Sequence, residues 1–459
     1  TTTALGNFST TQIASFSTTQ VQSLSAVQLN GVSSTQLDAF DSTKLTGTQI
    51  VGLVTTTIGN LTATQVDSLT STQVTQLTAL QFGVLSSTEI QGFSTTQANA
   101  LTTRQLSGLS STALNNFSTT QINAFSTTQL RSLSVAQLNA VSSDTLGAVD
   151  ITKLSTTQQL GLNTTSIGNL TTTQVGNLAS TQVSLLTAAQ FGALTSTEVQ
   201  AFTTTQANAL TGSQLHSFTT TGVNLFSSTQ VGAFSTNQAQ SLTTTQLNAL
   251  SIDSLDAVDL TKISTSQLVG LNTTSIGELT TTQVSGFSTS QVASLTTSQF
   301  GALSQAEVQA FTTTQANALT TAQIRGLTTT AVNMFSSTQI GALATTQAQS
   351  LTTTQLNSLS IDSLDAVDVT KINAPQVTGL STTSISNLTT VQVGTFSSTQ
   401  IASLTTSQIG TLTGNEVQAF TSTQTNAFTT TQLGSLATAA FDLFSSDQIY
   451  GFTTTQLQS

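Results

Sequence analysis

The chain has no cysteine and no tryptophan, and it has only one histidine, one methionine, one tyrosine and one proline among 459 residues. The missing thiols exclude disulfides, Cys-ligated zinc and thiol catalysis. Only 5% of the residues are charged, against about 25% in an ordinary soluble domain. Seven Lys and Arg residues face eighteen Asp and Glu residues, for a net charge of −11. Binding to nucleic acid or to an anionic membrane surface needs a basic patch, so we expect neither partner.

Long apolar runs are missing as well. No stretch approaches the ~18 apolar residues of a membrane helix, because a Ser/Thr/Gln cluster intervenes every few positions. We therefore expect no membrane insertion. Thr1 is not followed by a basic and then apolar signal segment, so we expect a processed mature chain or a window of a longer one.

An eight-residue repeat runs through the chain. Apolar residues alternate at intervals of five and three residues, and a polar quartet such as Ser17-Thr18-Thr19-Gln20 fills each longer interval. The unit is [S/T]-[S/T]-x-Q-φ-x-x-φ, where φ is apolar. In one continuous helix the apolar stripe would rotate by about 80° per repeat, which excludes a long amphipathic helix or coiled coil. The three-residue interval also breaks the alternation of a strand, so a series of very short helices remains.

Each quartet predicts the start of one short helix. Ser17 is placed as the N-cap, and Gln20 stands at N3, where its side chain can reach back to the N-cap N–H in a capping box. Phe16 and Val21 occupy the two positions of a hydrophobic staple. Helices this short are unstable alone and must stack on one another. We therefore predict an all-α solenoid of very short capped helices, wound as a superhelix, with a β-solenoid as the alternative.

A longer repeat contains the octads. The segment Asp-x-Thr-Lys recurs at the evenly spaced positions 41, 150, 259 and 368 and carries all four lysines. We call the interval from one such segment to the next the long repeat. We predict that its charged residues form a structural junction: Asp41 and Lys44, Asp150 and Lys153, Asp259 and Lys262, Asp368 and Lys371. Glu89, Glu198, Glu307 and Glu416 keep the same spacing. The long repeat divides the chain into a partial repeat 1–40, repeat units 41–149, 150–258 and 259–367, and a partial unit 368–459.

The junction is the one irregularity of the long repeat. Thirteen octads and one pentad fill each copy, and the pentad lacks one φ-x-x-φ turn. Lys262 replaces the N3 glutamine there, and an ammonium group cannot accept a hydrogen bond, so that capping box is broken. We expect the junction to adjust the winding. The constant spacing indicates either recent duplication or a geometric requirement, and we favour the second. One long repeat then corresponds to a whole number of superhelical turns or to one lattice step of an assembly, with the four junction aspartates on one line.

Acidic residues gather at the later junctions. Asp253, Asp256 and Asp259 stand three residues apart, and such oxygen ligands could hold Ca²⁺. The other interpretation is that they are cap and first-turn carboxylates favoured by the helix dipole, with Lys262 neutralising one of them. We favour this second interpretation, because the first two copies lack the full set and no calcium-loop motif surrounds it. We predict no metal and no cofactor.

No set of residues indicates catalysis. His216 is the only imidazole, and the same position of the next copy holds Arg325. Neither a Ser-His-Asp arrangement nor a His-rich metal site can therefore recur from copy to copy. We expect that the chain is not an enzyme.

Octads such as Thr280-Thr281-Thr282-Gln283-Val284-Ser285-Gly286-Phe287 resemble the long Ser/Thr/Gln-rich octapeptide-repeat regions of bacterial secreted surface proteins, over the whole chain. Some of those proteins are labelled adhesin-like or haem-utilisation proteins. The resemblance implies an extracellular bacterial setting and a structural or adhesive role. A haem-binding role has no support in the sequence, because the residues that could serve as axial ligands, His216, Met334 and Tyr450, do not recur between copies.

Together these features predict a structural repeat protein, the body of an extracellular filament, sheath or surface stalk. Such a body would grow by solenoid stacking and self-assembly, so the expected partner is the chain itself, together with a cell surface or extracellular matrix. The alternative is a surface-binding module, either an adhesin arm or an ice-binding protein. Threonine arrays can order water, but capping already accounts for the threonines here.

Overall fold

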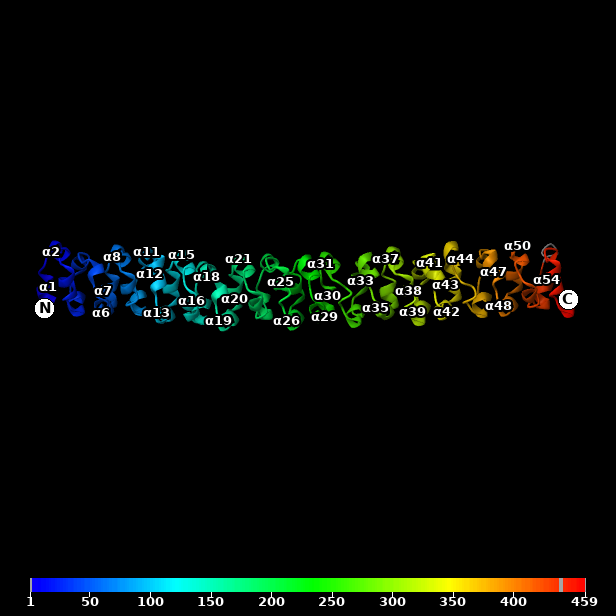
Figure 1. Ribbon diagram of the computed structural model, residues 1–459, viewed down its shortest axis with the longest axis horizontal. Coiled ribbons are helices and arrows are strands. Elements are labelled where there is room, and N and C mark those ends of the chain that lie inside the picture. The colour runs from blue at the N-terminus through cyan, green and yellow to red at the C-terminus, as the bar shows by residue number, and fades with distance from the viewer. Residues whose placement is uncertain (1, 437–440, 459) are drawn as a thin grey trace. The chain divides into compact units, whose positions relative to one another are not determined.

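The computed structural model describes residues 2–436 and 441–458. The chain separates into two compact units, Thr1–Phe234 and Ser235–Ser459. In the described residues these units hold 54 α-helices of four to six residues and two 3-10 helices, and no strand (Figure 1). The predicted all-α solenoid of very short helices is confirmed. The alternative β-solenoid is wrong for these residues.

The elements of the first compact unit follow the octads, one helix to an octad. They are α1 (Thr2–Gly6), α2 (Thr10–Ala14), α3 (Thr18–Gln22), α4 (Ala26–Asn30), α5 (Ser34–Leu37), η1 (Ser42–Lys44), α6 (Gly47–Gly52), α7 (Thr55–Gly59), α8 (Ala63–Asp67), α9 (Ser71–Val74), α10 (Ala79–Phe82), α11 (Ser87–Gly92), α12 (Thr95–Ala100), α13 (Thr103–Gly108), α14 (Ser111–Asn115), α15 (Thr119–Asn123), α16 (Thr127–Ser132), α17 (Val135–Ala140), α18 (Ser143–Ala148), η2 (Ile151–Lys153), α19 (Thr156–Gly161), α20 (Thr164–Gly168), α21 (Thr172–Gly176), α22 (Ser180–Val183), α23 (Ala188–Phe191), α24 (Ser196–Gln200), α25 (Thr204–Ala207), α26 (Gly212–Ser217), α27 (Thr220–Val223) and α28 (Ser228–Gly232).

The second compact unit continues the pattern, with turns in place of 3-10 helices at its two pentads. Its helices are α29 (Thr236–Ser241), α30 (Thr244–Asn248), α31 (Ile252–Ala257), α32 (Thr265–Val269), α33 (Thr273–Gly277), α34 (Thr281–Ser285), α35 (Thr289–Ser294), α36 (Thr297–Phe300), α37 (Gln305–Ala310), α38 (Thr313–Ala316), α39 (Thr321–Gly326), α40 (Thr329–Val332), α41 (Ser337–Gly341), α42 (Thr345–Ala348), α43 (Thr353–Ser358), α44 (Ile361–Asp365), α45 (Ala374–Thr378), α46 (Thr382–Ser386), α47 (Thr390–Gly394), α48 (Ser398–Ser403), α49 (Thr406–Ile409), α50 (Gly414–Gln418), α51 (Ser422–Thr425), α52 (Thr430–Gly434), α54 (Ser446–Tyr450) and α55 (Thr454–Leu457).

Capping explains where these helices begin. At α3 the Ser17 hydroxyl accepts a hydrogen bond from the Gln20 N–H, and Gln20 Oε1 accepts one from the Ser17 N–H at 2.7 Å. This reciprocal pair is the predicted capping box, and most helices repeat it. Alanine stands at the N-cap of α22, where only the glutamine half of the box forms, from the Ala179 N–H to Gln182 Oε1 at 3.0 Å. A cap in nearly every octad restarts the helix instead of extending it.

The two apolar positions of the octad form the core. Val292 in α35 and Leu295 directly after it are 0% and 2% exposed, and other octads are similar. Aromatic side chains from neighbouring turns of the solenoid stack within this core. The ring of Phe191, in α23, and that of Phe218, directly after α26, have centroids separated by 4.2 Å and lie nearly parallel. Short helices that could not persist alone are stabilised by this shared apolar interior.

Each helix packs mainly on the helix three places earlier in the chain, as α11 does on α8 and α37 does on α34. Small residues permit close approach between neighbouring helices. A Cβ built on Gly270, after α32, would lie only 2.2 Å from the Thr244 Cγ2 at the start of α30. In Figure 1, α8, α11 and α15 lie along the same upper edge of the first compact unit, at intervals of three and then four helices.

Candidate functional site

The glutamine at N3 is the polar side chain that recurs most often in the interior. In α36, Gln299 Oε1 accepts the Thr296 N–H at 3.0 Å in the capping box. Its Nε2 donates to three main-chain carbonyls of the preceding turn of the solenoid, at 2.9 Å to Leu268, 3.1 Å to Val269 and 2.8 Å to Leu271. One buried side chain thus starts a helix and joins two turns. We call this series of Nε2 bonds the glutamine ladder.

The capping role of this glutamine follows from the octad sequence, but its role in the ladder was not predicted. The available signal was the strong preference for glutamine at N3, although a capping box accepts glutamate as well. Only the amide supplies N–H donors in addition to the capping oxygen. A preference for Gln over Glu therefore indicates that the second end of the side chain meets acceptors.

The ladder also gives the length of one coil, meaning one turn of the solenoid. Gln299 and Gln105 each donate to a carbonyl 28 residues earlier, which is three and a half octads. Across a pentad the separation falls to 25 residues, as between Gln267 and Leu242. Three coils of the ordinary length and one shortened coil together fill the interval from Asp41 to Asp150. The long repeat therefore corresponds to four coils of the ladder.

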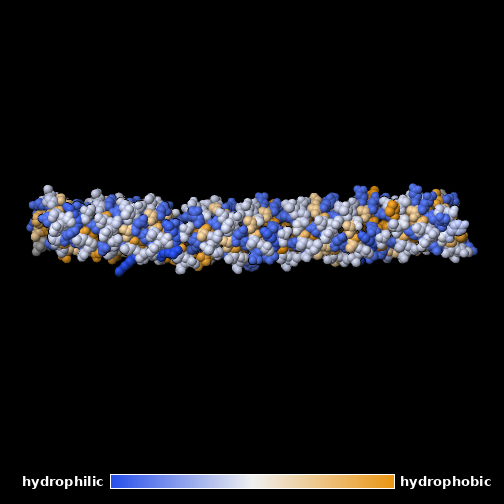
Figure 2. Space-filling model, viewed as in Figure 1, coloured by the Kyte–Doolittle hydropathy of each residue, from blue (hydrophilic) through white to orange (hydrophobic). Residues whose placement is uncertain are grey.

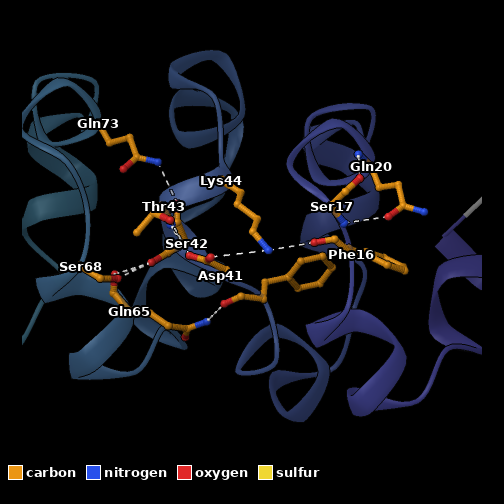
Figure 3. A network of polar contacts seen from close by, with 11 residues as sticks. Phe16, Ser17, Gln20, Asp41, Ser42, Thr43, Lys44, Gln65, Ser68 and Gln73 are labelled. Atoms are coloured by element: carbon orange, nitrogen blue, oxygen red, sulfur yellow. Dashed lines mark hydrogen bonds and ion pairs between the residues drawn. The ribbon is translucent and has the colours of Figure 1, made fainter.

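The first junction is drawn in Figure 3. Asp41 Oδ1 accepts the Thr43 N–H at 3.1 Å and the Thr43 hydroxyl at 2.6 Å, which fixes the turn of η1. Lys44 Nζ lies 3.6 Å from Asp41 Oδ2 and donates to the Phe16 carbonyl at 2.9 Å. Phe16 precedes Lys44 by 28 residues, the separation of the ladder. The lysine thus supplies the donor that glutamine supplies elsewhere, and the Asp41 turn replaces the capping box.

Main-chain carbonyls of the same pentad accept hydrogen bonds from the next coil (Figure 3). Gln73 Nε2 donates to the carbonyls of Ser42 and Leu45, each at 2.8 Å, as it would to the two apolar residues of an octad. The buried Ser42 hydroxyl donates to the Gln65 carbonyl at 2.7 Å and lies 2.8 Å from Ser68 Oγ. The pentad therefore shortens one coil without interrupting the ladder.

The Asp–Lys ion pair recurs in all four copies, with Nζ to Oδ2 distances of 3.4 to 3.6 Å and both side chains partly exposed. The hydrogen bond from the Thr43 hydroxyl lowers the pKa of Asp41, whereas burial raises it. The Thr43 N–H and the Lys44 ammonium also lower this pKa, and the net effect is a lowered pKa. The corresponding groups lower the pKa of Asp259 and Asp368. Burial is the largest influence on Asp150 and raises its pKa. The hydrogen bonds from Thr152 and the interaction with Lys153 outweigh it, so the pKa of Asp150 is lowered too.

Four glutamates recur with the long repeat and stand at the N3 position that glutamine holds in other octads: Glu89, Glu198, Glu307 and Glu416. Glu198 Oε2 accepts the Thr195 N–H at 2.7 Å, and Glu307 Oε2 accepts the Ser304 N–H at 2.6 Å. Both side chains are more than nine-tenths buried. Glu89 is less buried and lies near Asp67 of α8; burial and the charge of Glu89 raise the pKa of Asp67.

The other residues considered from the sequence stay apart. Asp253 lies in the first turn of α31, Asp256 near its end, and Asp259 in the junction turn that follows. Across residues 2–436 and 441–458, no group of three or more His, Cys, Asp or Glu side chains could hold a metal ion. His216 lies in the last turn of α26, on the surface. Among these same residues no helix has the length and apolarity needed to cross a membrane.

Comparison with known proteins agrees with a repeat architecture. A family model described as the ALTTAQ repeat matches residues 260–297, a stretch that begins in the third pentad and continues through four helices. No curated protein matches the chain. The chain is a helical repeat protein.

Proposed function

We propose that the chain is the repetitive body of an extracellular filament, sheath or surface stalk that grows by stacking of its coils. It would act by assembly and not by catalysis, with no cofactor, and its main partner would be another copy of itself. The cell surface or extracellular matrix is the proposed location. The resemblance to repeat regions of bacterial secreted surface proteins supports that setting.

The observation that carries this proposal is that the glutamine ladder joins successive coils through the same hydrogen bonds in both compact units. Gln105 donates to carbonyls 31 and 28 residues earlier in the first compact unit, and Gln355 does the same in the second. The donors stand at one octad position, and the acceptors belong to the main chain. Coils that carry these glutamines can therefore match one another side to side, and repeats of this kind stack without an intrinsic limit.

The surface suits a structural role. On the face shown in Figure 2, hydrophilic and intermediate residues surround small, separate hydrophobic spots. Large exposed apolar side chains such as Val27, Leu80 and Val391 are spread along the sequence. Net charge is −11 over 459 residues, with few lysines or arginines to attract nucleic acid or an anionic membrane surface.

Electron microscopy of the purified chain over a range of concentrations tests the proposal. We expect ordered fibres or sheets in the micrographs. In analytical ultracentrifugation the mean particle mass should increase with protein concentration. Isolated particles of constant mass would contradict self-assembly. Particles that carry a distinct binding tip would favour the adhesin arm, and thermal hysteresis in freezing assays would favour an ice-binding protein. Antibody labelling of intact source cells tests the location.

A further inference from the structure

Basic side chains outside the junctions are few, and they recur at equivalent places of the long repeat. Four of the seven Lys and Arg residues are the junction lysines, and the other three are Arg104, Arg131 and Arg325. The three arginine side chains are exposed, and so is His216. Arg325 stands one long repeat after His216, so these two residues hold the same position in successive copies.

In the second compact unit Arg325 lines an open groove of about 450 Å³ between α39 and α42. The residues that line this groove are Thr321, Ala322, Arg325, Thr346, Gln349 and Ser350. Ala322 and Gln349 stand two long repeats after Arg104 and Arg131, which belong to the packed helices α13 and α16 of the first unit. All three arginines therefore occupy positions of one kind of groove. We call the places of Arg104, Arg131, His216 and Arg325 the basic sites.

The surroundings of the basic sites carry little opposite charge. None of the helices α13, α16, α26, α39 and α42 has an acidic side chain. The helices α10 and α23, which pack on α13 and α26, have none either. At the end of α16, Arg131 Nε donates to the Lys153 carbonyl at 3.0 Å, and the Lys153 ammonium is paired with Asp150. The basic sites are thus exceptions on a chain whose net charge is −11.

Exposed acidic side chains lie on the opposite edge of each compact unit. In the second unit Asp253 belongs to α31 and Asp362 to α44, and both side chains are exposed. Figure 1 places α31 and α44 along the upper edge of this unit and α39 and α42 along its lower edge. In the first unit the exposed Asp67 and Asp144 belong to α8 and α18 of the upper edge, whereas α13 and α26 lie along the lower edge. Each unit therefore has an acidic edge and a basic edge.

We propose that two copies of this chain associate side by side, with the acidic edge of one copy against the basic edge of the other. The inference rests on the proposed self-assembly and adds to it a lateral contact, distinct from the stacking of coils. Asp144, Asp253 and Asp362 recur with the long repeat, as His216 and Arg325 do. The same compact unit of two copies, set side by side in register, therefore presents acids to basic sites at one common period. A partner with an unrelated period would not match in this way.

The chemistry of the two edges determines the character of the contact. A guanidinium group binds a carboxylate through two parallel hydrogen bonds. Exposed pairs of this kind are individually weak and are screened by salt. Their effects add when several pairs form along one contact. Because the contact joins different surfaces of the two copies, it leaves one edge of each copy open and continues into a sheet.

Sedimentation velocity of the full chain at about 20 mM and about 500 mM salt, with electron microscopy of the same samples, tests this proposal. Wild type is expected to form lateral pairs and sheets at low salt that separate at high salt. Arg104→Gln/Arg131→Gln/Arg325→Gln is expected to weaken lateral association by on the order of tenfold. The matched control Ala136→Glu/Thr245→Glu/Thr354→Glu gives the same net charge at exposed positions of α17, α30 and α43 and should behave as wild type.

A charge swap tests whether the two edges meet each other. Arg104→Glu/Arg131→Glu/Arg325→Glu reverses the basic edge, and Asp144→Lys/Asp253→Lys/Asp362→Lys reverses the acidic edge. Each variant alone is expected to associate laterally less than wild type. An equimolar mixture of the two is expected to associate more than either variant alone, because each reversed edge then meets an unreversed edge of like origin with opposite charge.

Three results would overturn the proposal. They are a wild-type chain without salt-dependent lateral association, a control that weakens association as much as the arginine variant does, and a mixture that associates no more than its components. Single fibres without lateral contacts would leave the proposed filament standing and overturn this inference alone. Lateral pairs without fibres would instead overturn the stacking of coils. Arginine-dependent retention on an immobilised anionic polysaccharide, without lateral association, would assign the basic sites to an anionic polymer.

Discussion

Replacing one ladder glutamine separates its two roles. Gln299 is 3% exposed, accepts the Thr296 N–H and donates to the carbonyls of Leu268 and Leu271. Gln299→Met preserves most of the side-chain volume and removes every hydrogen bond of the side-chain amide, including a weaker one to the Val269 carbonyl at 3.1 Å. Two buried carbonyls are left without this donor, at a cost of about 1–3 kcal/mol each, and one cap bond is lost. We expect the free energy of unfolding to fall by about 3 kcal/mol.

The comparison with Gln299→Glu identifies which role dominates. Glutamate keeps the capping acceptor, as Glu307 does with Ser304, but at neutral pH it has no ladder donor. If the ladder carries most of the energy, Gln299→Glu should cost as much as Gln299→Met in urea unfolding at pH 7.5. Ser298→Ala, at the exposed neighbouring position, should change stability by less than about 0.5 kcal/mol. A small loss in both Gln299 variants would refute the ladder as a stabilising element.

Further changes test individual features of the fold. Ala179→Ser supplies the missing half of a capping box and should raise the unfolding free energy by about 1 kcal/mol in urea titrations; no gain would count against capping as the signal that starts α22. Gln159→Leu removes a buried Oε1 that has no partner, at the cost of one bond to the Gln182 carbonyl, and should raise the melting temperature; a marked fall would show that this bond outweighs the unpartnered oxygen. The lowered pKa of Asp259 means that its carboxylate stabilises the fold above the ordinary value of 3.8 and that this contribution is lost as the pH falls further. Asp259→Asn should therefore flatten the loss of stability below pH 4, by less than about 1 kcal/mol because the pair is partly exposed; an unchanged pH profile would contradict the assignment.

Local structure could be predicted from the sequence almost completely. The quartet Ser17-Thr18-Thr19-Gln20 specifies the cap, the helix start and the buried Val21 through contacts within a single octad. The number of octads in a coil could not be predicted, because it depends on which distant carbonyls the glutamine Nε2 reaches. The broken capping box at the lysines followed from chemistry, since ammonium cannot accept a hydrogen bond.

The donor role of lysine at the junction could not be predicted in the same way. The Phe16 carbonyl that Lys44 reaches lies 28 residues away and is near only in the folded solenoid. The three candidate calcium-ligand aspartates illustrate the opposite case. Their regular spacing in sequence places them at different parts of α31 and the following turn instead of around one point.

Disulfide mapping measures the coil most directly, because the chain has no cysteine to compete. A Cβ on Gly176 would lie 3.6 Å from the Ala201 Cβ, 25 residues later on the neighbouring coil, which is within the range of disulfide Cβ separations. We predict that Gly176→Cys/Ala201→Cys forms an intramolecular disulfide rapidly under mild oxidation. The control pair Gly176→Cys/Ala193→Cys is closer in sequence by one octad and should remain reduced. Faster or equal cross-linking of the control pair would contradict a coil of three and a half octads.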